Sequence, residues 1–365
     1  MNAFALPYED LSRSNAFLWE EWERVFRQML QKGQFVLGEA LADFEQAFAR
    51  YCGAKWAIGV NSGLDALTLA LKVLNLPPQS EVLLPAHTFI ATVFSVLQAG
   101  LKPVLVEPEA DTMLVSRRTL EAAQTPQTRA IVIVHLYGQM PEMPSIMALA
   151  RQKGWWVLED AAQAHGARYL GQSAGSWGDL AAFSFYPAKN LGALGDGGGI
   201  TTQSAEWAEK LQKARNYGSL VKYYHDEPGL NSRLDALQAA FLSVKLPYLD
   251  QINAHKHHLA QLYHSHLRED FILPAVLPHS QPVYHIFSIR HPAREALREY
   301  LLRQGIQTAI HYPLPVFRQK ALAGRWNPAH YPLTAQICQT QLSLPIAYFH
   351  TEDDILRVIE IMNRF

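Results

Sequence analysis

The sequence predicts an α/β protein with a large, mostly parallel sheet and a smaller α+β domain at its C-terminal end. Three observations lead to this expectation. The chain has 365 residues, which is long for one domain and typical of two. Short apolar runs alternate with helical periodicity over roughly 200 residues. After residue 245 this alternation stops and Pro-punctuated strands follow. We therefore expect a large domain at 1–245 and a small domain at 246–365.

Composition narrows the class of protein further. The chain carries 32 Lys and Arg against 33 Asp and Glu, without the basic excess of nucleic-acid or bilayer-binding proteins. Apolar residues make up 49%, enough for a large core. Cys52 and Cys338 alone form neither a disulfide framework nor a zinc site. The chain shows no apolar run long enough for a transmembrane helix and no secretory signal near its start. We therefore expect a globular, cytoplasmic protein with no nucleic-acid or membrane partner.

The elements of the large domain follow from apolar periodicity. Segment 18–50 is expected to be helical because apolar side chains such as Trp22, Phe26 and Leu30 recur at helical spacing. Strands and helices then alternate. The run 130–136 (AIVIVHL) is apolar almost throughout, as expected of a strand buried on both faces. The expected strands are 56–60, 81–85, 103–107, 130–136, 156–158, 181–185 and 199–202, and the expected helices between them are 64–74, 91–98 and 143–152.

The C-terminal part is expected to begin with a long helix at 249–267. Further elements should follow as strands at 284–290, a helix at 293–304, a Pro-rich loop at 311–315 and a helix at 353–363. The long helix carries a cluster of basic residues, but no two of its histidines are spaced i and i+4, as a metal-binding helix face requires. We therefore expect a solvated helix face and no metal site at His255, Lys256, His257, His258, His264 and His266.

Three stretches follow predicted strands at the edge of the sheet where open α/β proteins bind ligands. Ser62 and Gly63 precede a helix, and a helix N-terminus suits a phosphate. Asp160 directly follows a buried strand. Lys189 follows another strand beside the glycine-rich run 192–199, where a lysine with a lowered pKa could form a Schiff base. Taken singly, each has a commoner explanation: an N-cap for Ser62, a cap or turn for Asp160 and a solvated side chain for Lys189.

Taken together, these residues favour a cofactor site. A phosphate cradle, a carboxylate and a Ser-x-x-x-x-Lys segment ending 29 residues after Asp160 are the set that pyridoxal phosphate needs. The carboxylate keeps the pyridine nitrogen protonated, so that the ring can act as an electron sink. The lysine holds the aldehyde as an imine, and the helix N-terminus holds the phosphate.

The chain as a whole resembles a known family. It is similar nearly end to end to the DegT/DnrJ/EryC1/StrS sugar aminotransferases, which are pyridoxal-phosphate enzymes of fold type I, like aspartate aminotransferase. The strings that carry the resemblance are G-x-x-x-L-G-x-x-L-x-x-F-E at 33–45, NSGLDAL at 61–67, PAHTFIAT at 85–92, HLYGQ at 135–139, EDAAQAHGA at 159–167, FSFYPAKNLGALGDGG at 183–198 and GLNSRLD at 229–235.

The resemblance implies a role for each matching residue near the cofactor. Lys189 would hold the cofactor and act as general acid and base, and Asp160 would pair with the pyridine nitrogen. Gln163 would bind near the phenolic oxygen, although it could also be a turn residue. Phe89 would stack on the ring unless it is plain core. Phosphate contacts would come from the backbone of Ser62, Gly63 and Leu64 and from the hydroxyl of Ser184, which could also cap its strand.

The resemblance also implies an assembly. Asn231 would reach the phosphate of the neighbouring subunit, which implies a homodimer with shared active sites. Asn231 as a simple turn residue is the alternative.

The presence of Lys189 favours transamination, since the family's dehydratases replace this lysine with histidine. The resemblance implies L-glutamate as donor, leaving as 2-oxoglutarate, and a nucleotide-sugar ketone as acceptor. Strings 162–167 and 183–198 resemble the subgroup that acts at C3 of dTDP-3-keto-6-deoxyhexoses, for deoxyamino sugars such as those of lipopolysaccharide O-antigen. Ala188 departs mildly from the glycine expected there. Amination at C4, or a regulatory or scaffold protein without activity, are the alternatives.

Substrate contacts are the least specific expectation. Hydroxyl and imidazole groups suit a hexose with few charges, which favours Tyr186, His311 and Tyr312, with Tyr224 from the partner subunit. The alternatives are core packing for Tyr186 and Tyr312, an ordinary loop histidine for His311 and a surface aromatic for Tyr224. Cationic candidates for the nucleotide diphosphate are Arg215, Lys222 and Arg233, although a surface or structural charge is the commoner role of each.

Overall fold

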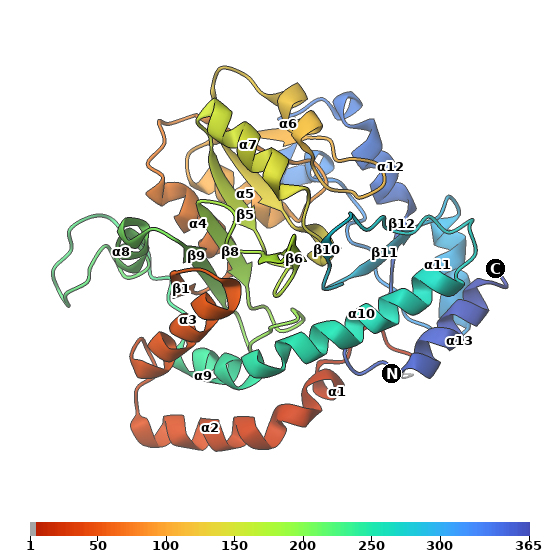
Figure 1. Cartoon of the computed structure of the whole chain (residues 1–365), viewed down its shortest axis with the longest axis horizontal. Coiled ribbons are helices and arrows are strands. Elements are labelled where there is room, and N and C mark those ends of the chain that lie inside the picture. Colours follow the sequence, from red (N-terminus) through yellow and green to blue (C-terminus); the bar gives the residue numbers. More distant parts are fainter. Residues whose placement is uncertain (1–4) are drawn as a thin grey trace.

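Seven strands form the central sheet of the computed structural model, which describes residues 5–365. Their order across the sheet is β1-β9-β8-β5-β4-β2-β3 (Figure 1). Strand β9 runs antiparallel to both of its neighbours, and all the other pairs are parallel. The expected large, mostly parallel sheet is therefore confirmed. The strands are β1 (Trp56–Val60), β2 (Glu81–Pro85), β3 (Lys102–Val106), β4 (Thr128–Val134), β5 (Trp156–Asp160), β8 (Leu180–Ser184) and β9 (Gly198–Thr202).

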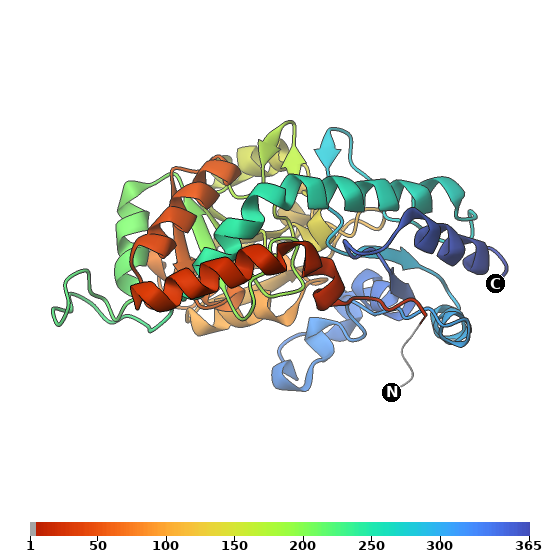
Figure 2. The ribbon, with the colours of Figure 1, turned by 90° about the horizontal axis from the view of Figure 1, so that it is seen from below.

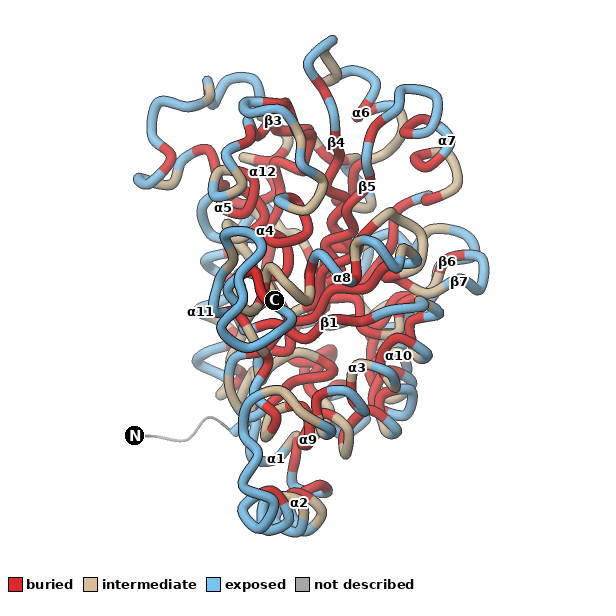
Figure 3. Tube along the Cα trace, turned by 90° about the vertical axis from the view of Figure 1, so that its left-hand side faces the viewer, coloured by how far each residue is buried: buried red, intermediate tan, exposed pale blue. Residues whose placement is uncertain are grey.

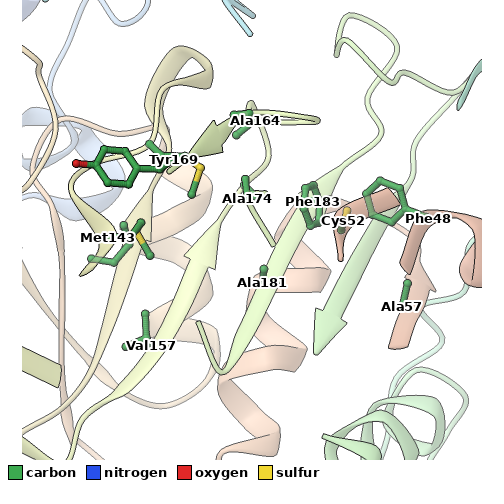
Figure 4. Packing of buried hydrophobic residues seen from close by; sticks show 14 of the residues in the cluster. Phe48, Cys52, Ala57, Met143, Val157, Ala164, Tyr169, Ala174, Ala181 and Phe183 are labelled. Carbon is green, nitrogen blue, oxygen red and sulfur yellow. The ribbon is translucent and has the colours of Figure 1, made fainter. Parts of the chain in front are cut away.

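Helices cover both faces of this sheet. Successive residues of a strand alternate between two separate apolar clusters: Val157 and Phe183 belong to one, Leu158 and Ala182 to the other. Figure 4 shows Phe48 and Cys52 of one covering helix beside Phe183, and the rings of Phe48 and Phe183 are 4.9 Å apart. The helices of this part are α3 (Glu39–Cys52), α4 (Gly63–Val73), α5 (Ile90–Gln98), α6 (Arg117–Ala123), α7 (Met143–Lys153), α8 (Ala205–Ala214) and α9 (Ala236–Lys245).

Helix α2 (Trp19–Lys32), which follows the short α1 (Leu11–Asn15), lies at the lower edge of Figure 1. Its buried Trp22 donates a hydrogen bond to the carbonyl of Phe241 at 3.1 Å. By contrast, Phe26 is 42% exposed and Leu30 54% exposed. Phe26 is 7 and Leu30 is 11 residues beyond the exposed Trp19, so that the three side chains lie on one face of the helix. We call these three residues the α2 face. The helix was predicted correctly, but its apolar residues divide between core and surface (Figure 3).

The C-terminal part has its own apolar cluster, between α10 (Leu249–His266), α11 (Arg294–Arg303), α13 (Glu352–Met362) and the antiparallel pair β11 (Phe287–Arg290) and β12 (Gln341–Leu344). The long α10 extends from the large sheet to this part (Figure 1). The sequence predicted α10, α11 and α13, but not β12 or α12 (Pro332–Thr340).

Other segments connect the two parts. Leu6, near the start of the chain, forms a bridge with Ile306. Val316 and Ile337 join an apolar cluster of the large sheet. A short strand β10 (Ser280–Gln281) pairs with β6 (Arg168–Tyr169), which also pairs with β7 (Gln172–Ser173). The division at 245/246 stays a prediction. Among residues 5–365, the helices are all too short or too polar to cross a membrane.

One loop stands apart from the body. Residues 217–230 follow α8 and extend outward at the left of Figures 1 and 2. A bridge between Asn216 and Asn231 closes the base of the loop. Tyr223 is 81% exposed and Tyr224 72% exposed. The loop therefore presents aromatic side chains to its surroundings and not to its own core.

Candidate active site

A cavity of about 580 Å³ opens where β1, β2, β5 and β8 end. Parallel strands bring their carboxyl ends to one edge of a sheet, so segments distant in sequence meet there. Residues of the C-terminal part complete the wall. The expected residues that line the cavity are Ser62, Gly63, Leu64, Phe89, Asp160, Gln163, Ser184, Tyr186, Lys189, His311 and Tyr312.

The N-terminus of α4 forms one end of this cavity. Ser62 is its N-cap, and the hydroxyl accepts a hydrogen bond from the N–H of Asp65 at 3.1 Å. The N–H groups of Gly63 and Leu64 have no intrahelical acceptor at this position. A Cβ on Gly63 would come within 2.8 Å of the Cβ of Ser184, and one on Gly198 within 2.3 Å of the Ser62 carbonyl. Ser62 is thus an ordinary cap, and the cap leaves two N–H groups available for an anion.

Asp160 is the last residue of β5 and faces the cavity. Its Oδ2 accepts a hydrogen bond from Thr92 Oγ1 at 2.8 Å, and Thr92 contacts Thr88 Oγ1 at 2.8 Å. Its Oδ1 accepts from the N–H of Ala162 at 3.3 Å. Burial raises the pKa of Asp160, and the hydrogen bond from Thr92 opposes that rise. A cationic group bound against the carboxylate would favour its ionised form.

The neighbouring acid, Glu159, faces the other side of the sheet, as strand geometry requires. Its carboxylate accepts hydrogen bonds from the N–H groups of Gly175, Trp177 and Gly178 at 2.8–3.0 Å. His135 Nε2 lies 2.7 Å from the same carboxylate. Glu159 therefore organises a turn, and only Asp160 of this acidic pair is available to a ligand.

Lys189 lies five residues beyond β8, where its backbone N–H bonds the carbonyl of Tyr186 at 2.8 Å. Its Nζ is 3.5 Å from Nε2 of His285. Burial lowers the pKa of Lys189 to about 8, and the charge of Asp160 opposes this shift. With this pKa about a tenth of the amine is neutral at pH 7, and the neutral amine is the nucleophile that an aldehyde needs. Lys189 is half-buried in the cavity wall, which favours a ligand-binding role over a solvated side chain.

Aromatic side chains form the walls beside Lys189. Phe89 is 53% exposed and Tyr186 55% exposed, so neither is plain core. The ring of Phe89 lies 5.5 Å from that of Tyr312. Gln163 is buried; its Oε1 accepts from the N–H of Tyr137 at 2.6 Å, and its Nε2 donates to the hydroxyl of Tyr312 at 3.1 Å. The amide thereby joins the cofactor end of the cavity to the C-terminal part.

His311 belongs to a further part of the cavity wall, which we call the rim: Tyr186, His311 and Tyr312, with Tyr8 of the N-terminal segment. Nδ1 of His311 is 2.8 Å from Ser343 Oγ, and its ring is 5.9 Å from that of Tyr8. Burial lowers the pKa of His311 to about 4, so the imidazole is neutral at pH 7. The rim therefore offers hydroxyl and imidazole groups without charge.

Several expected residues lie outside this cavity. Asn231 and Tyr224 are exposed and do not line the cavity of their own chain. Arg233 donates to Asn216 Oδ1 at 2.9 Å. The diphosphate role considered for Arg215 is wrong: the buried guanidinium pairs with Glu45 and donates to the carbonyl of Gly59 at 2.8 Å. Lys222 is exposed on the loop.

Other lining residues escaped the sequence analysis: Tyr8, Glu9, Thr92, Lys256 and His285. The expectation of a solvated helix face is wrong for Lys256, which is 5% exposed. Leu259, Ala260 and Tyr263 are buried on the same face of α10, at helical spacing from Lys256. That spacing was the signal that would have placed the lysine in the interior. Thr92, Tyr8 and His285 carry no such signal.

The donor set fits pyridoxal phosphate. Glycines at 63 and 198 allow the backbone approach that a phosphate cradle needs, because side chains there would collide with Ser184 and Ser62. A buried carboxylate and an amine with a lowered pKa line the same cavity. Gly63 and Leu64 would hold the phosphate, Asp160 the pyridine nitrogen and Lys189 the aldehyde carbon.

Comparison with known proteins identifies the family of the chain. The model of the DegT/DnrJ/EryC1/StrS aminotransferase family matches residues 18–363. A dTDP-3-amino-3,6-dideoxy-alpha-D-galactopyranose transaminase from Aneurinibacillus thermoaerophilus is 45% identical over 361 residues, covering 99% of each chain. The structure of S. venezuelae DesV in complex with ketimine intermediate is 42% identical, with a TM-score of 0.97, and covers 100% of this chain and 98% of that one.

The structure of NtdA from Bacillus subtilis with bound cofactor PMP is 29% identical, with a TM-score of 0.91, and covers 100% of this chain and 86% of that one. The chain belongs to the DegT/DnrJ/EryC1/StrS aminotransferase family. The expected fold class and the expected cofactor, pyridoxal phosphate, are confirmed.

Proposed function

We propose that the chain transfers the amino group of L-glutamate to C3 of a dTDP-linked 3-keto-6-deoxyhexose. The observation that carries this proposal is one cavity lined both by Lys189 and Asp160 and by an uncharged polar rim. The name of the relative at 45% identity supports a dTDP-linked 3-amino sugar. The loop strings at 162–167 and 183–198 support C3 over C4.

The chain's own residues divide the work of the reaction. Pyridoxal phosphate, when bound, supplies an electron sink and carries the amino group between the two substrates. Asp160, oriented by Thr92, keeps the pyridine nitrogen protonated. Lys189 moves a proton at the reacting carbon through Nζ, and its lowered pKa leaves part of the amine able to accept that proton. The N-terminus of α4 holds the phosphate and so fixes the position of the ring.

The rim would select the carbon of the hexose. Choosing C3 over C4 means shifting the sugar by about one ring atom, which a few hydrogen bonds can decide. His311 is neutral, so one ring nitrogen donates and the other accepts, and Nδ1 already faces Ser343. Nε2 remains for the sugar. The hydroxyls of Tyr186 and Tyr312 supply further contacts.

The substrate assignment is tested by offering both ketones to one enzyme. Purified enzyme is given L-glutamate with equal amounts of the dTDP-3-keto and dTDP-4-keto sugars, and NMR locates the new amine. We expect the 3-amino sugar to dominate. A kcat/KM for the 4-keto sugar equal to or above that for the 3-keto sugar would establish C4 amination instead. No amine in either product would favour the regulatory or scaffold alternative.

The proposed assembly is a homodimer with shared active sites. The α2 face and the loop 217–230 both expose apolar and aromatic side chains, which supports burial against a second copy. Asn231 and Tyr224, at or near that loop, would then serve the partner's cavity. A cytoplasmic location, expected from the composition of the chain, and a product destined for lipopolysaccharide O-antigen, implied by the resemblance, complete the proposal.

Shared sites are tested by mixing two defective chains. One chain carries Lys189→Ala, and the other carries Asn231→Ala with Tyr224→Phe. In their heterodimer one site carries every defect and the other none. We therefore expect about half of the wild-type activity to return. If verified heterodimers recovered no activity, Asn231 and Tyr224 would serve the active site of their own chain.

A further inference from the structure

Lys256 is a buried cation in the cavity wall that no step of the proposed mechanism uses. It projects from α10 and is 5% exposed. Among the lining residues, all within the described range 5–365, Lys189 and Lys256 carry the only Lys or Arg side chains. Three carboxylates also line the cavity, at Glu9, Asp160 and Asp196. Asp160 is taken by Thr92 and the cofactor, so Lys256 needs a separate explanation.

The ammonium group of Lys256 is poorly satisfied. It has three N–H donors, and its one hydrogen bond within the described chain goes to the carbonyl of His285 at 3.3 Å. Glu9 lines the same cavity, but its Oε1 accepts from the N–H of Asp10 and from Ser14 Oγ. Burial lowers the pKa of Lys256 to about 8, with the charge of Glu9 opposing, so the group is mainly cationic at pH 7. An anion beside it would relieve this unfavourable burial.

His285 links this cation to the reacting centre. Its Nε2 is 3.5 Å from Lys189 Nζ, and its carbonyl accepts the hydrogen bond from Lys256. The amines of Lys189 and Lys256 therefore contact the same residue, one its ring and the other its carbonyl. An amino acid reacting at the position of Lys189 carries its α-carboxylate one bond from the reacting carbon. That carboxylate is the anion that can reach Lys256.

We propose that Lys256 binds the α-carboxylate of the amino donor and so positions the donor for proton transfer by Lys189. This proposal rests on the proposed function, which supplies an amino-acid donor. The other anions that would enter the cavity are the cofactor phosphate, which the N-terminus of α4 would hold, and the nucleotide diphosphate. A nucleotide must extend toward solvent, whereas Lys256 is buried on the side of Lys189, so the carboxylate is favoured.

A second buried lysine provides a matched control. Lys245 is also 5% exposed, and burial also lowers its pKa to about 8. Its Nζ donates to Asn15 Oδ1 at 3.0 Å, and Lys245 lies outside this cavity, in a small neighbouring pocket that Glu9, Lys189 and Lys256 also line. Replacing either lysine with methionine removes a buried cation, but only Lys256→Met removes a cation from the cavity.

The test measures donor binding without any sugar. Calorimetry of the holoenzyme with glutarate, which has two carboxylates and no amine, gives a binding constant. Rapid mixing with L-glutamate gives the concentration dependence of the first half-reaction. Lys256→Met should weaken glutarate binding and raise the half-saturating glutamate concentration about tenfold or more, the effect of losing a charge-assisted hydrogen bond. Lys256→Arg should restore most of the affinity, and Lys245→Met should leave both values within about threefold.

Three outcomes would overturn the proposal. The first is unchanged glutarate binding in Lys256→Met, and the second is equal loss in Lys245→Met. The third is weakened binding of dTDP with normal binding of glutarate, which would assign Lys256 to the diphosphate. If Lys256→Met does not fold by circular dichroism, Lys256→Gln replaces it in the same comparison. Failure of the proposed function looks different, because the wild-type enzyme would then fail to aminate the 3-keto sugar while still binding glutarate.

Discussion

The cofactor residues and most of the rim are built from different kinds of sequence. The cofactor residues come from short stretches at or just beyond the ends of β1, β5 and β8, such as Ser62, Asp160 and Lys189. In the rim, Tyr186 also follows β8, but Tyr8 comes from the N-terminal segment and His311 from the C-terminal part, more than 300 positions away. The cofactor residues are therefore contiguous with the sheet, whereas the rim is complete only when distant segments pack together.

This difference corresponds to a difference in chemical role. Both half-reactions of a transaminase use the same cofactor, so every residue that holds it serves both. In the proposed function, the rim and Lys256 contact the substrates, which differ between the half-reactions. Damage at the cofactor end should therefore affect glutamate and sugar equally. Damage at the rim should affect only one of the two.

The largest effect is expected for Lys189→Ala. Loss of the amine removes both the covalent attachment of the cofactor and the proton transfer, so both half-reactions should slow by about 10³-fold or more. Stopped-flow absorbance of each half-reaction measures this, with cofactor content as control. The phosphate cradle and Asp160 should retain the cofactor. Turnover within tenfold of wild type would reject the assignment of Lys189.

Asp160→Asn should come next. The amide can no longer keep the pyridine nitrogen protonated, so both half-reactions should slow by roughly 10²–10³-fold, the scale of losing one electrostatic contact at a reacting centre. The fold should persist, because asparagine has the same size as aspartate and lies against the same groups, Thr92 and the N–H of Ala162. The same stopped-flow assay applies. Unequal losses in the two half-reactions would contradict the expectation that the cofactor residues serve both of them equally.

Tyr186→Phe and His311→Ala test the rim. Each removes hydrogen bonds of about 1–3 kcal/mol when a buried partner is left unpaired, which corresponds to roughly tenfold to a hundredfold. We expect this loss in the sugar half-reaction and little change in the glutamate half-reaction. The ratio of the two rate constants for each variant measures the separation. Equal losses with both substrates would assign these residues to the cofactor instead.

The smallest effect concerns stability without cofactor. Burial lowers the pKa of Lys189 from 10.5 to about 8, so the folded state binds this proton less readily than the unfolded state. Below pH 8 the penalty of the buried charge is fully present, and it disappears between pH 8 and 10.5 as the unfolded lysine also loses its proton. Lys189→Met should therefore raise the Tm of the apoprotein at pH 7, and the gain should shrink toward pH 10.

Thermal unfolding followed by circular dichroism at pH 7 and pH 10 measures this gain. The exposed Lys222 supplies the control, because Lys222→Met should leave the Tm unchanged at both values. A gain for Lys189→Met that stays constant with pH would mean that the buried charge is not its cause.

The same contrast explains how much could be predicted from the sequence. Asp160 and Lys189 lie directly after apolar runs that read as strands, so local pattern located them. The alternation of those runs also predicted the sheet. Elements with weaker patterns, such as α12 and β12, gave no signal because their residues are buried by packing against distant segments.

The rim and Lys256 show the limit of local reasoning. Lys256 stands in a run of polar residues, HKHH, which predicts solvent exposure. The side chain is buried because this face of α10 packs against other segments of the folded chain. Tyr8 and His285 carry no pattern at all, since only the packing of the N-terminal and C-terminal segments brings them to the cavity. Conversely, Phe26 and Leu30 form a good helical stripe yet lie on the surface, because the periodicity does not show what covers it.

The central claim is that one cofactor, held in the cavity, carries an amino group between two substrates that bind beside it in turn. Rapid-scanning absorbance tests it directly. The holoenzyme is mixed with L-glutamate, freed of small molecules, and then mixed with the dTDP-3-keto sugar. The account predicts that glutamate abolishes the visible absorption of the bound cofactor and that the sugar restores it in a single turnover. No change with glutamate, or restoration by the 4-keto sugar at an equal or higher rate, would contradict it.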